Sequence, residues 1–266
     1  MTIHFLSGLP RTGSTLLGSL LGQNPDIYVT PTSPMYSLLV NANNHFNLLA
    51  SQYTFDLDAT SDRIYSAMVQ AFYAPIRQPV IFDKHRGWPK NIQAIKKYLN
   101  ADPVIVATVR PIAEIITSYL VLAEKDENNF IDAHLRREGQ PLTNESRAHL
   151  LWSQYLNSPY DYLTQGLATS PENILLIQYD DIVYTPHAVL NRIYAACNLD
   201  RYRHQIDVIE NRCAEAKDEA WGLKNLHTIR PTLSRQSANP LDYLPREAVE
   251  YFSQFDIQEA SCHARS

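Results

Sequence analysis

The sequence predicts an α/β protein whose mostly parallel central sheet is covered by helices on both faces. Short apolar segments alternate with longer segments of helical character along the chain, and this alternation is typical of parallel sheets. The length of 266 residues suits a single domain over residues 1–266. The 45% of hydrophobic residues suffices for a large core and excludes global disorder.

The first half of the chain is predicted to supply three of the strands. Ile3–Ser7 is apolar and precedes a turn at residues 8–13, and leucines at helical spacing predict a helix over residues 14–21. Asn24 and Pro25 end that helix. The other elements expected here are a strand at 27–29, a rigid loop at 30–34, helices over 35–74 with a break at 53–60, a strand at 80–82 ending at Asp83 and Lys84, and a helix at 89–99.

The second half contains the most regular strand, residues 104–109, which is β-branched and almost uninterrupted. Pro111 is expected to open the following helix, where its missing N–H is not needed. A strand at 174–177 and a helix at 186–197 complete the expected elements. The polar stretch 124–147 suits either a solvated surface or a mobile flap over a ligand, and residues 214–246 are irregular.

Charge and cysteine content narrow the function and the compartment. The net charge of -5 argues against nucleic-acid binding through a basic surface. Three irregularly spaced cysteines indicate free thiols in a reducing compartment, which favours a cytoplasmic protein; they are Cys197, Cys213 and Cys262. No apolar run reaches the length of a membrane helix, and the N-terminus does not resemble a secretory signal.

The turn after the first strand has the pattern of a phosphate-binding loop. It reads Gly-Leu-Pro-Arg-Thr-Gly-Ser-Thr over residues 8–15, between a strand and a helix, where free backbone N–H groups and the helix dipole favour an anion. The two glycines have the spacing of the nucleotide-triphosphate loop, but Ser14 replaces its lysine and Arg11 supplies a cation inside the loop. A glycine-rich turn without a ligand is the alternative.

Residues 6–17, Leu-Ser-Gly-Leu-Pro-Arg-Thr-Gly-Ser-Thr-Leu-Leu, resemble the 5′-phosphosulfate loop of sulfotransferases. These enzymes take a sulfuryl group from 3′-phosphoadenosine 5′-phosphosulfate (PAPS). Arg11 is similar to the loop arginine of tyrosylprotein and bacterial members, whereas cytosolic members have lysine. The resemblance implies a three-layer, P-loop NTPase-like sulfotransferase fold and a contact to the donor from Arg11, Thr12, Gly13, Ser14 and Thr15.

A second motif, residues 104–119, resembles the family's strand and helix that bind the 3′-phosphate. Arg110 follows the strand and Ser118 lies eight residues later, about two helical turns on, so a guanidinium and a hydroxyl can converge on one phosphate. A third stretch, residues 174–199, resembles the family's next strand and helix. It implies that Tyr179 lies beside the nucleotide, with Asp180 in place of the usual glutamate.

The resemblance also implies residues for the reacting centre. Arg11 and Lys84 are the expected cations at the transferring group, since transfer depends on positioning and charge stabilisation. Residues 30–34 hold no carboxylate where tyrosylprotein sulfotransferases have their catalytic glutamate. His85 is therefore the expected general base, with Asp83 in reserve and a structural histidine as the alternative.

The late segment His227–Arg235 contains basic and hydroxyl residues between prolines. It resembles the segment that closes over the nucleotide in bacterial and tyrosylprotein sulfotransferases, which implies a closing segment at 221–246 with contacts from Ser234 and Arg235. A plain surface loop is the alternative.

Together these features predict a PAPS-dependent sulfotransferase that needs no metal ion and releases 3′,5′-ADP (PAP). The acceptor is expected to be a hydroxyl of a small molecule, sugar, lipid or peptide, and neither nucleic acid nor a membrane is an expected partner. Two alternatives stay open: a P-loop kinase with a degenerate loop, and a nucleotide-binding protein without catalysis.

Overall fold

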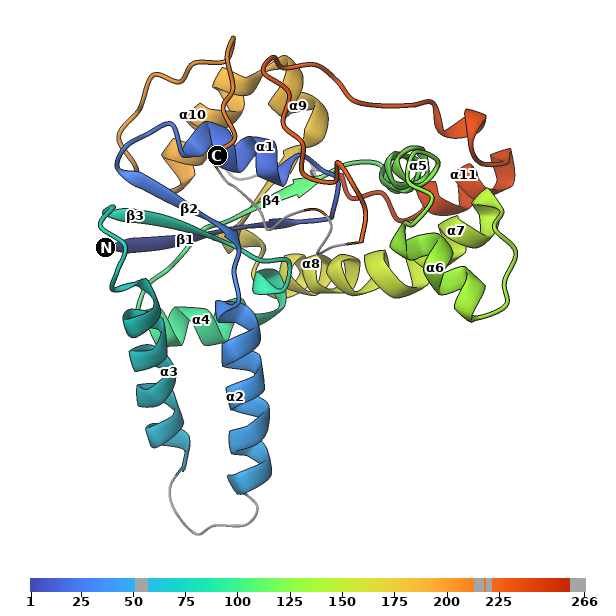
Figure 1. Cartoon of the computed structure of the whole chain (residues 1–266). Coiled ribbons are helices and arrows are strands. Elements are labelled where there is room, and N and C mark those ends of the chain that lie inside the picture. Colours follow the sequence, from blue (N-terminus) through green and yellow to red (C-terminus); the bar gives the residue numbers. More distant parts are fainter. Residues whose placement is uncertain (51–56, 213–217, 219–221, 259–266) are drawn as a thin grey trace.

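A parallel sheet forms the centre of the computed structural model, which describes residues 1–50, 57–212, 218 and 222–258 (Figure 1). The strand order is β2-β3-β1-β4-β5, and all neighbouring strands are parallel. The strands are β1 (Thr2–Gly8), β2 (Ile27–Thr32), β3 (Val80–Lys84), β4 (Ile105–Val109) and β5 (Ile174–Gln178). The parallel α/β architecture predicted from the sequence is confirmed.

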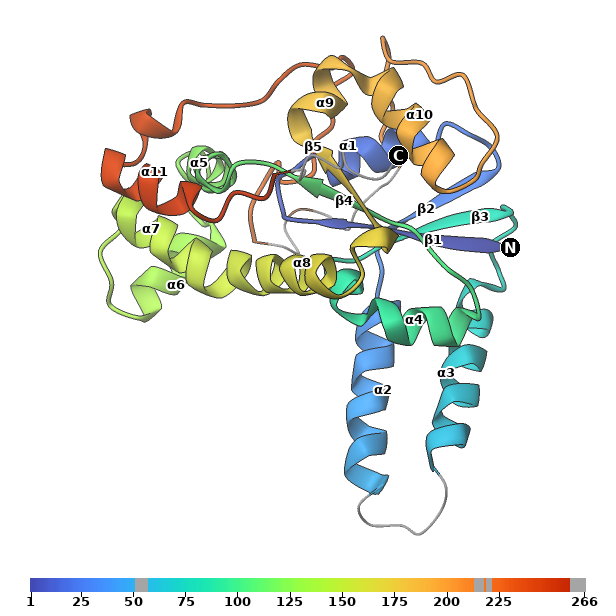
Figure 2. The same ribbon diagram turned by 180° about the vertical axis from the view of Figure 1, so that it is seen from behind.

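Helices cover both faces of the sheet, which makes three layers (Figures 1 and 2). On one face lie α1 (Ser14–Leu21), α9 (Tyr179–Tyr184) and α10 (Pro186–Ala196). On the other lie α4 (Ile92–Leu99), which follows the short 3₁₀ helix Trp88–Asn91, and α8 (Asn157–Thr169). Strand alternation fits this arrangement, since Leu6 packs with the α1 and α10 side chains while Phe5 packs with those of α4.

Further helices gather beyond the carboxyl ends of the strands (Figure 1). The 3₁₀ helix Pro171–Asn173 is not among them, because it directly precedes β5 at the amino-terminal edge of the sheet. The helices beyond the carboxyl ends are α5 (Ile112–Ala123), α6 (Phe130–Arg137), α7 (Asn144–Leu150) and α11 (Arg246–Ser253), together with the π-helix Leu151–Leu156 and the 3₁₀ helix Pro240–Asp242. They share a second apolar core. The polar stretch 124–147 therefore includes two helices with a buried face, which Asn129 and Thr143 cap.

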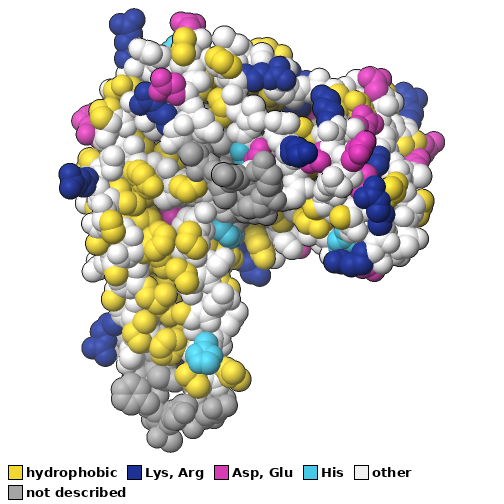
Figure 3. Space-filling view, in the orientation of Figure 1, with side chains coloured by type: hydrophobic (Ala, Val, Ile, Leu, Met, Phe, Trp, Pro, Cys, Tyr) yellow, Lys and Arg dark blue, Asp and Glu magenta, His cyan; other side chains and the backbone are white. Residues whose placement is uncertain are grey.

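The first long helical region forms an arm that projects from the body (Figures 1 and 2). It consists of α2 (Met35–Ala50) and α3 (Leu57–Tyr73). The break between the helices was predicted at 53–60, but it ends earlier, because α3 begins at Leu57. Residues 51–56 lie outside the described residues. Hydrophobic side chains run along the arm, while most charged ones lie over the body (Figure 3).

Strand β2 corrects one prediction. The loop expected at 30–34 is still strand at its start, since Thr32 pairs with Lys84 after a register shift that begins at Val29. Pro31 is tolerated there because β2 is an edge strand, where one row of backbone N–H groups needs no partner.

The remaining sequence predictions concern thiols and membrane segments. Cys197 is a buried free thiol, whereas Cys213 and Cys262 lie outside the described residues. Across the part of the chain that the structure describes, no helix combines the length and the apolar character needed to cross a membrane.

Candidate active site

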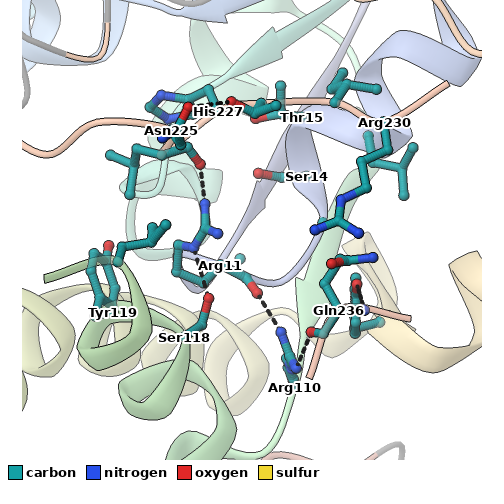
Figure 4. Close-up of a pocket in the computed structure, with 18 of the residues that line it drawn as sticks. Arg11, Ser14, Thr15, Arg110, Ser118, Tyr119, Asn225, His227, Arg230 and Gln236 are labelled. Atoms are coloured by element: carbon teal, nitrogen blue, oxygen red, sulfur yellow. Dashed lines mark hydrogen bonds between the residues drawn. The ribbon is translucent and has the colours of Figure 1, made fainter. Parts of the chain in front are cut away.

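A cavity of about 840 Å³ opens at the carboxyl ends of the central strands (Figure 4). Its lining includes residues from the ends of β1 and β3, the residue after β4, the start of α1, and much of residues 222–238, which we call the C-terminal segment. Ligands of open parallel sheets gather at this edge, because the loops that follow the strands converge there. The cavity size is typical of small-molecule and cofactor sites.

Two glycines shape the loop between β1 and α1. Gly8 has a φ of 115°, and a Cβ there would lie 2.1 Å from the Thr108 carbonyl oxygen. Gly13, at the N-cap of α1, has a φ of 85°, and a Cβ there would lie 2.9 Å from the Tyr179 ring. Both positions therefore require glycine. The loop turns tightly enough for the N-terminus of α1, with Ser14 and Thr15, to line the cavity.

Arg11 reaches from this loop into the cavity (Figure 4). Its Nε donates to the Ser118 Oγ at 3.1 Å, and its guanidinium also donates to the carbonyl of Leu226. Burial lowers the pKa of Arg11, but a guanidinium stays protonated in proteins. The loop therefore places a buried positive charge in the cavity, where it donates hydrogen bonds to one side-chain oxygen and one main-chain oxygen.

Lys84 brings a second cation to the same cavity from the end of β3. Its side chain is largely buried, and its Nζ donates to the Thr15 Oγ1 at 2.9 Å. Its backbone N–H donates to the Thr30 Oγ1 at 2.8 Å, which fixes the strand end. The lysine thus lies against the first turn of α1, as the sequence motifs imply.

Arg110 and Ser118 line the cavity as well. The Arg110 Nε donates to Glu114 at 2.9 Å, its second terminal nitrogen donates to the Gln236 carbonyl at 2.7 Å, and its guanidinium lies 4.4 Å from the centre of the Tyr179 ring. Ser118 accepts its hydrogen bond from Arg11. Arg110 also donates to the Arg11 carbonyl oxygen at 3.4 Å, so the structure brings both residues to one cavity and joins both to Arg11.

Three other predicted binding residues have structural partners. The Thr12 hydroxyl is buried against the Leu9 carbonyl and Thr108, both at 2.6 Å, so its side chain faces the core and not the cavity. The Ser234 hydroxyl lines the cavity and accepts from the Gln236 side chain at 2.8 Å. Arg235 is paired with Asp180 at 2.8 Å and with Glu114 at 2.9 Å. Thr12 is therefore not part of the cavity lining, whereas Arg235 lines the cavity and fastens the C-terminal segment to α5 and α9.

His85 lines the cavity, but the ring nitrogen that could act as a base is already used in a hydrogen bond. Its Nδ1 accepts the Gly87 N–H at 3.0 Å, which places its proton on Nε2. The ring stacks on Tyr36 at 4.3 Å. Burial, with a smaller contribution from Arg86, lowers the pKa of His85 to about 4. This geometry favours a structural role.

Asp83, the reserve base, lies in the core. It is fully buried and accepts from Tyr73 at 2.7 Å and from the Trp88 indole at 2.8 Å. Burial raises the pKa of Asp83 to about 6. The carboxylate does not belong to the cavity lining, so its hydrogen bonds serve the packing of the arm against the sheet.

The C-terminal segment adds residues that sequence reasoning did not single out. Arg230 and Arg11 reach into the cavity from different sides of Ser14 (Figure 4). His227 also lines the cavity, and Asp218 holds its ring at 2.8 Å. The only sequence signal for them is their place in a proline-bounded basic stretch. The described residues contain no group of three metal-ligating side chains that could hold an ion.

Known proteins resemble this chain in family and fold. The sulfotransferase family matches residues 4–204, and none of the curated proteins matches the chain. The structure is similar to sulfotransferase STF9 from Mycobacterium avium (TM-score 0.52, 16% identity, 97% of this chain and 77% of that one). It is also similar to the sulfotransferase domain of the Synechococcus PCC 7002 olefin synthase (TM-score 0.51, 16% identity, 95% of this chain and 93% of that one). A third similar structure is mouse sulfotransferase SULT7A1 complexed with PAP (TM-score 0.50, 14% identity, 95% of this chain and 82% of that one). The fold is the P-loop NTPase-like α/β fold of these proteins, and by its family match the chain belongs to the sulfotransferase family.

Proposed function

We propose that this protein transfers the sulfuryl group of PAPS to an acceptor hydroxyl. One observation carries the proposal: two separate anion-binding elements, the loop with Arg11 and the strand end with Arg110, line one cavity. PAPS carries one phosphate on the 3′-oxygen of its ribose and a phosphosulfate on the 5′-oxygen, so it needs two such anchors. Mouse SULT7A1, which shares the fold, is recorded in complex with PAP.

The first anchor would hold the 5′-phosphosulfate. The amides at the N-terminus of α1 and the hydroxyls of Ser14 and Thr15 offer hydrogen bonds to phosphate oxygens. Arg11 and Lys84 add positive charge beside them. During in-line transfer the acceptor oxygen bonds to sulfur as the bond from sulfur to the 5′-phosphate breaks. The two cations stabilise the charge that then develops on the departing phosphate.

The second anchor would hold the 3′-phosphate. Arg110 offers its guanidinium and Ser118 its hydroxyl from the end of β4 and from α5, and a charged phosphate is a stronger acceptor than a carbonyl oxygen. Binding would therefore draw Arg110 from the Gln236 carbonyl and Arg11 from the Leu226 carbonyl. Tyr179 and Ser234 would bind the nucleoside beside this anchor, and Arg235 would keep the C-terminal segment in place.

Ligand binding by calorimetry tests the proposal. We expect PAPS and PAP to bind tightly and adenosine 5′-phosphosulfate, which lacks the 3′-phosphate, to bind at least tenfold more weakly, because it loses a charge-assisted contact of about 1.5–3 kcal/mol. Sulfate release from PAPS should persist in EDTA, since Arg11 and Lys84 supply the positive charge. Tight binding of ATP with Mg²⁺ and none of PAP would favour the kinase alternative.

A further inference from the structure

We propose that His227, oriented by Asp218, is the general base that takes the proton from the acceptor hydroxyl. The inference rests on the proposed sulfuryl transfer and adds the group that the transfer still lacks. Neither residue belongs to the two motifs that form the proposed anchors for PAPS.

The contacts of Asp218 fix both the position and the tautomer of His227. The carboxylate accepts from the His227 Nδ1 at 2.8 Å and from the His227 backbone N–H at 3.2 Å. A carboxylate can only accept, so Nδ1 carries the ring proton and the lone pair of the neutral imidazole is on Nε2. Both side chains are largely buried, at 16% and 20% exposure. This is the pairing by which an acidic residue orients a catalytic histidine.

The two histidines of the cavity therefore differ in the nitrogen they can use. The Gly87 N–H occupies the lone pair of the His85 Nδ1, so the remaining nitrogen carries a proton and cannot accept another. In His227 the ring proton points to Asp218 instead. Of the two, only His227 has the tautomer that a general base requires.

His227 also lies near the two cations expected at the transferring group, Arg11 and Lys84. Leu226, the residue before it, accepts a hydrogen bond from the Arg11 guanidinium. The imidazole lies at the same end of the drawn site as Asn225 and Thr15 (Figure 4), and Thr15 accepts from the Lys84 Nζ. A hydroxyl brought to the sulfuryl group between Arg11 and Lys84 would therefore meet His227.

The backbone that leads into His227 is anchored. The Gly222 carbonyl accepts from the Phe130 N–H at 2.8 Å, and the Lys224 N–H donates to Asp126 at 3.1 Å. Leu226 is buried in the core of the α5 to α7 helices. A catalytic group needs this support, because its orientation decides whether proton transfer is productive.

The step balances without a further reactant. The acceptor O–H bond breaks and its proton moves to the His227 Nε2. The acceptor oxygen forms a bond to sulfur, and the bond from sulfur to the 5′-phosphate oxygen breaks with its electron pair on PAP. The products are the sulfated acceptor, PAP and a protonated imidazole, which returns its proton to water.

The test uses water as the acceptor, so PAPS is the only probe. Sulfate release under saturating PAPS is measured for the wild-type chain and for His227→Ala and Asp218→Asn, and the Kd for PAP is measured by calorimetry. We expect His227→Ala to lower kcat by about 10²–10⁴-fold, the usual contribution of a general base, with a Kd for PAP within about threefold. Added imidazole should restore part of the His227→Ala rate, which a purely structural histidine would not allow. Asp218→Asn should lower kcat and leave the Kd unchanged, and Asp218→Glu should recover activity.

The controls separate this inference from the proposed function. His187→Asn removes an exposed histidine on α10, away from the cavity, and should behave as wild type. If the wild-type chain neither binds PAP nor releases sulfate, the proposed transfer fails. If it does both and His227→Ala retains its kcat while His85→Asn loses it, His85 is the base and the inference is overturned.

Discussion

The loop of residues 8–15 and the C-terminal segment both line the cavity, but different forces hold them in place. The loop connects the central strand to α1, and sheet hydrogen bonds and helix packing fix both of its ends. Within the C-terminal segment no helix or strand is present. It is held largely by side chains from elsewhere, since Arg11 binds the Leu226 carbonyl, Arg110 binds the Gln236 carbonyl, and the Tyr179 hydroxyl accepts the Gln236 N–H at 3.1 Å.

This difference links the position of the C-terminal segment to the ligand. The arginines that hold the segment are those expected to bind the two phosphates of PAPS. A phosphate competes for the same donors as the two carbonyl oxygens and forms the stronger, charge-assisted bonds. We therefore expect substitutions in the loop to act chiefly on chemistry, and substitutions at contacts to the segment to act on affinity and on the order of the segment.

The largest effect is expected for Arg11→Ala. The variant removes the charge that stabilises the departing phosphate, and loss of one such group typically costs about 10²–10³-fold in rate. The measurement is the single-turnover rate of sulfate release from PAPS. The matched control is Arg201→Ala, an exposed arginine outside the cavity. A change of less than about threefold for Arg11→Ala would mean that the loop positions PAPS and takes no part in charge stabilisation.

Next in size is the pH dependence of stability at His85. Its pKa in the folded chain, about 4, lies below the ordinary 6.5, so the unfolded chain binds the extra proton and stability falls as the pH drops from 6.5 to 4. Each pKa unit corresponds to about 1.4 kcal/mol, so His85 can change the free energy of unfolding by at most about 3.5 kcal/mol.

Urea unfolding of the wild type and of His85→Asn at pH 4.5 and pH 7 measures this contribution to the free energy of unfolding. Asparagine keeps an acceptor for the Gly87 N–H and does not titrate. His4 and Asp83 titrate equally in both proteins and cancel in the difference. Equal pH dependence of the two proteins would refute a buried, neutral His85.

Arg110→Ala should separate the contribution of the second anchor to ligand affinity from that of the loop. We expect the Kd for PAP to rise about tenfold to 100-fold, which corresponds to a charge-assisted hydrogen bond of about 1.5–3 kcal/mol. The Kd for adenosine 5′-phosphosulfate, which has no 3′-phosphate, should change less than about threefold. Equal losses for both ligands in calorimetry would show that Arg110 does not bind the 3′-phosphate.

The smallest effect is expected for Tyr179→Phe. The ring stays beside Arg110 and only the hydrogen bond from the Gln236 N–H is lost. Such a bond contributes about 0.5–1.5 kcal/mol, so affinity for PAP should fall about two- to tenfold and limited proteolysis within 222–238 should become faster. Tyr184→Phe, an exposed tyrosine of the same helix, is the control. Unchanged proteolysis would show that the hydroxyl does not hold the segment.

The sheet and the loop before α1 could be predicted from local sequence patterns. The alternation of strands and helices predicted the parallel sheet, and the glycine spacing predicted the loop before α1. Both follow from residues close in sequence, whose backbone preferences act before any tertiary contact forms. Arg110 and Lys84 could be found in the same way, because each directly follows or ends a regular strand at the edge where parallel strands deliver their loops.

Tertiary structure alone decided which of these side chains face the cavity. The Thr12 hydroxyl turns into the core because Thr108, from a neighbouring strand, offers it a buried partner. The pairing of Arg235 with Glu114, and of Arg11 with the Leu226 carbonyl, joins residues more than a hundred positions apart. The tautomers of His85 and His227 depend on single hydrogen bonds to Gly87 and Asp218. No spacing rule encodes such contacts, because they depend on how separate elements pack and on which polar partner each buried group then meets.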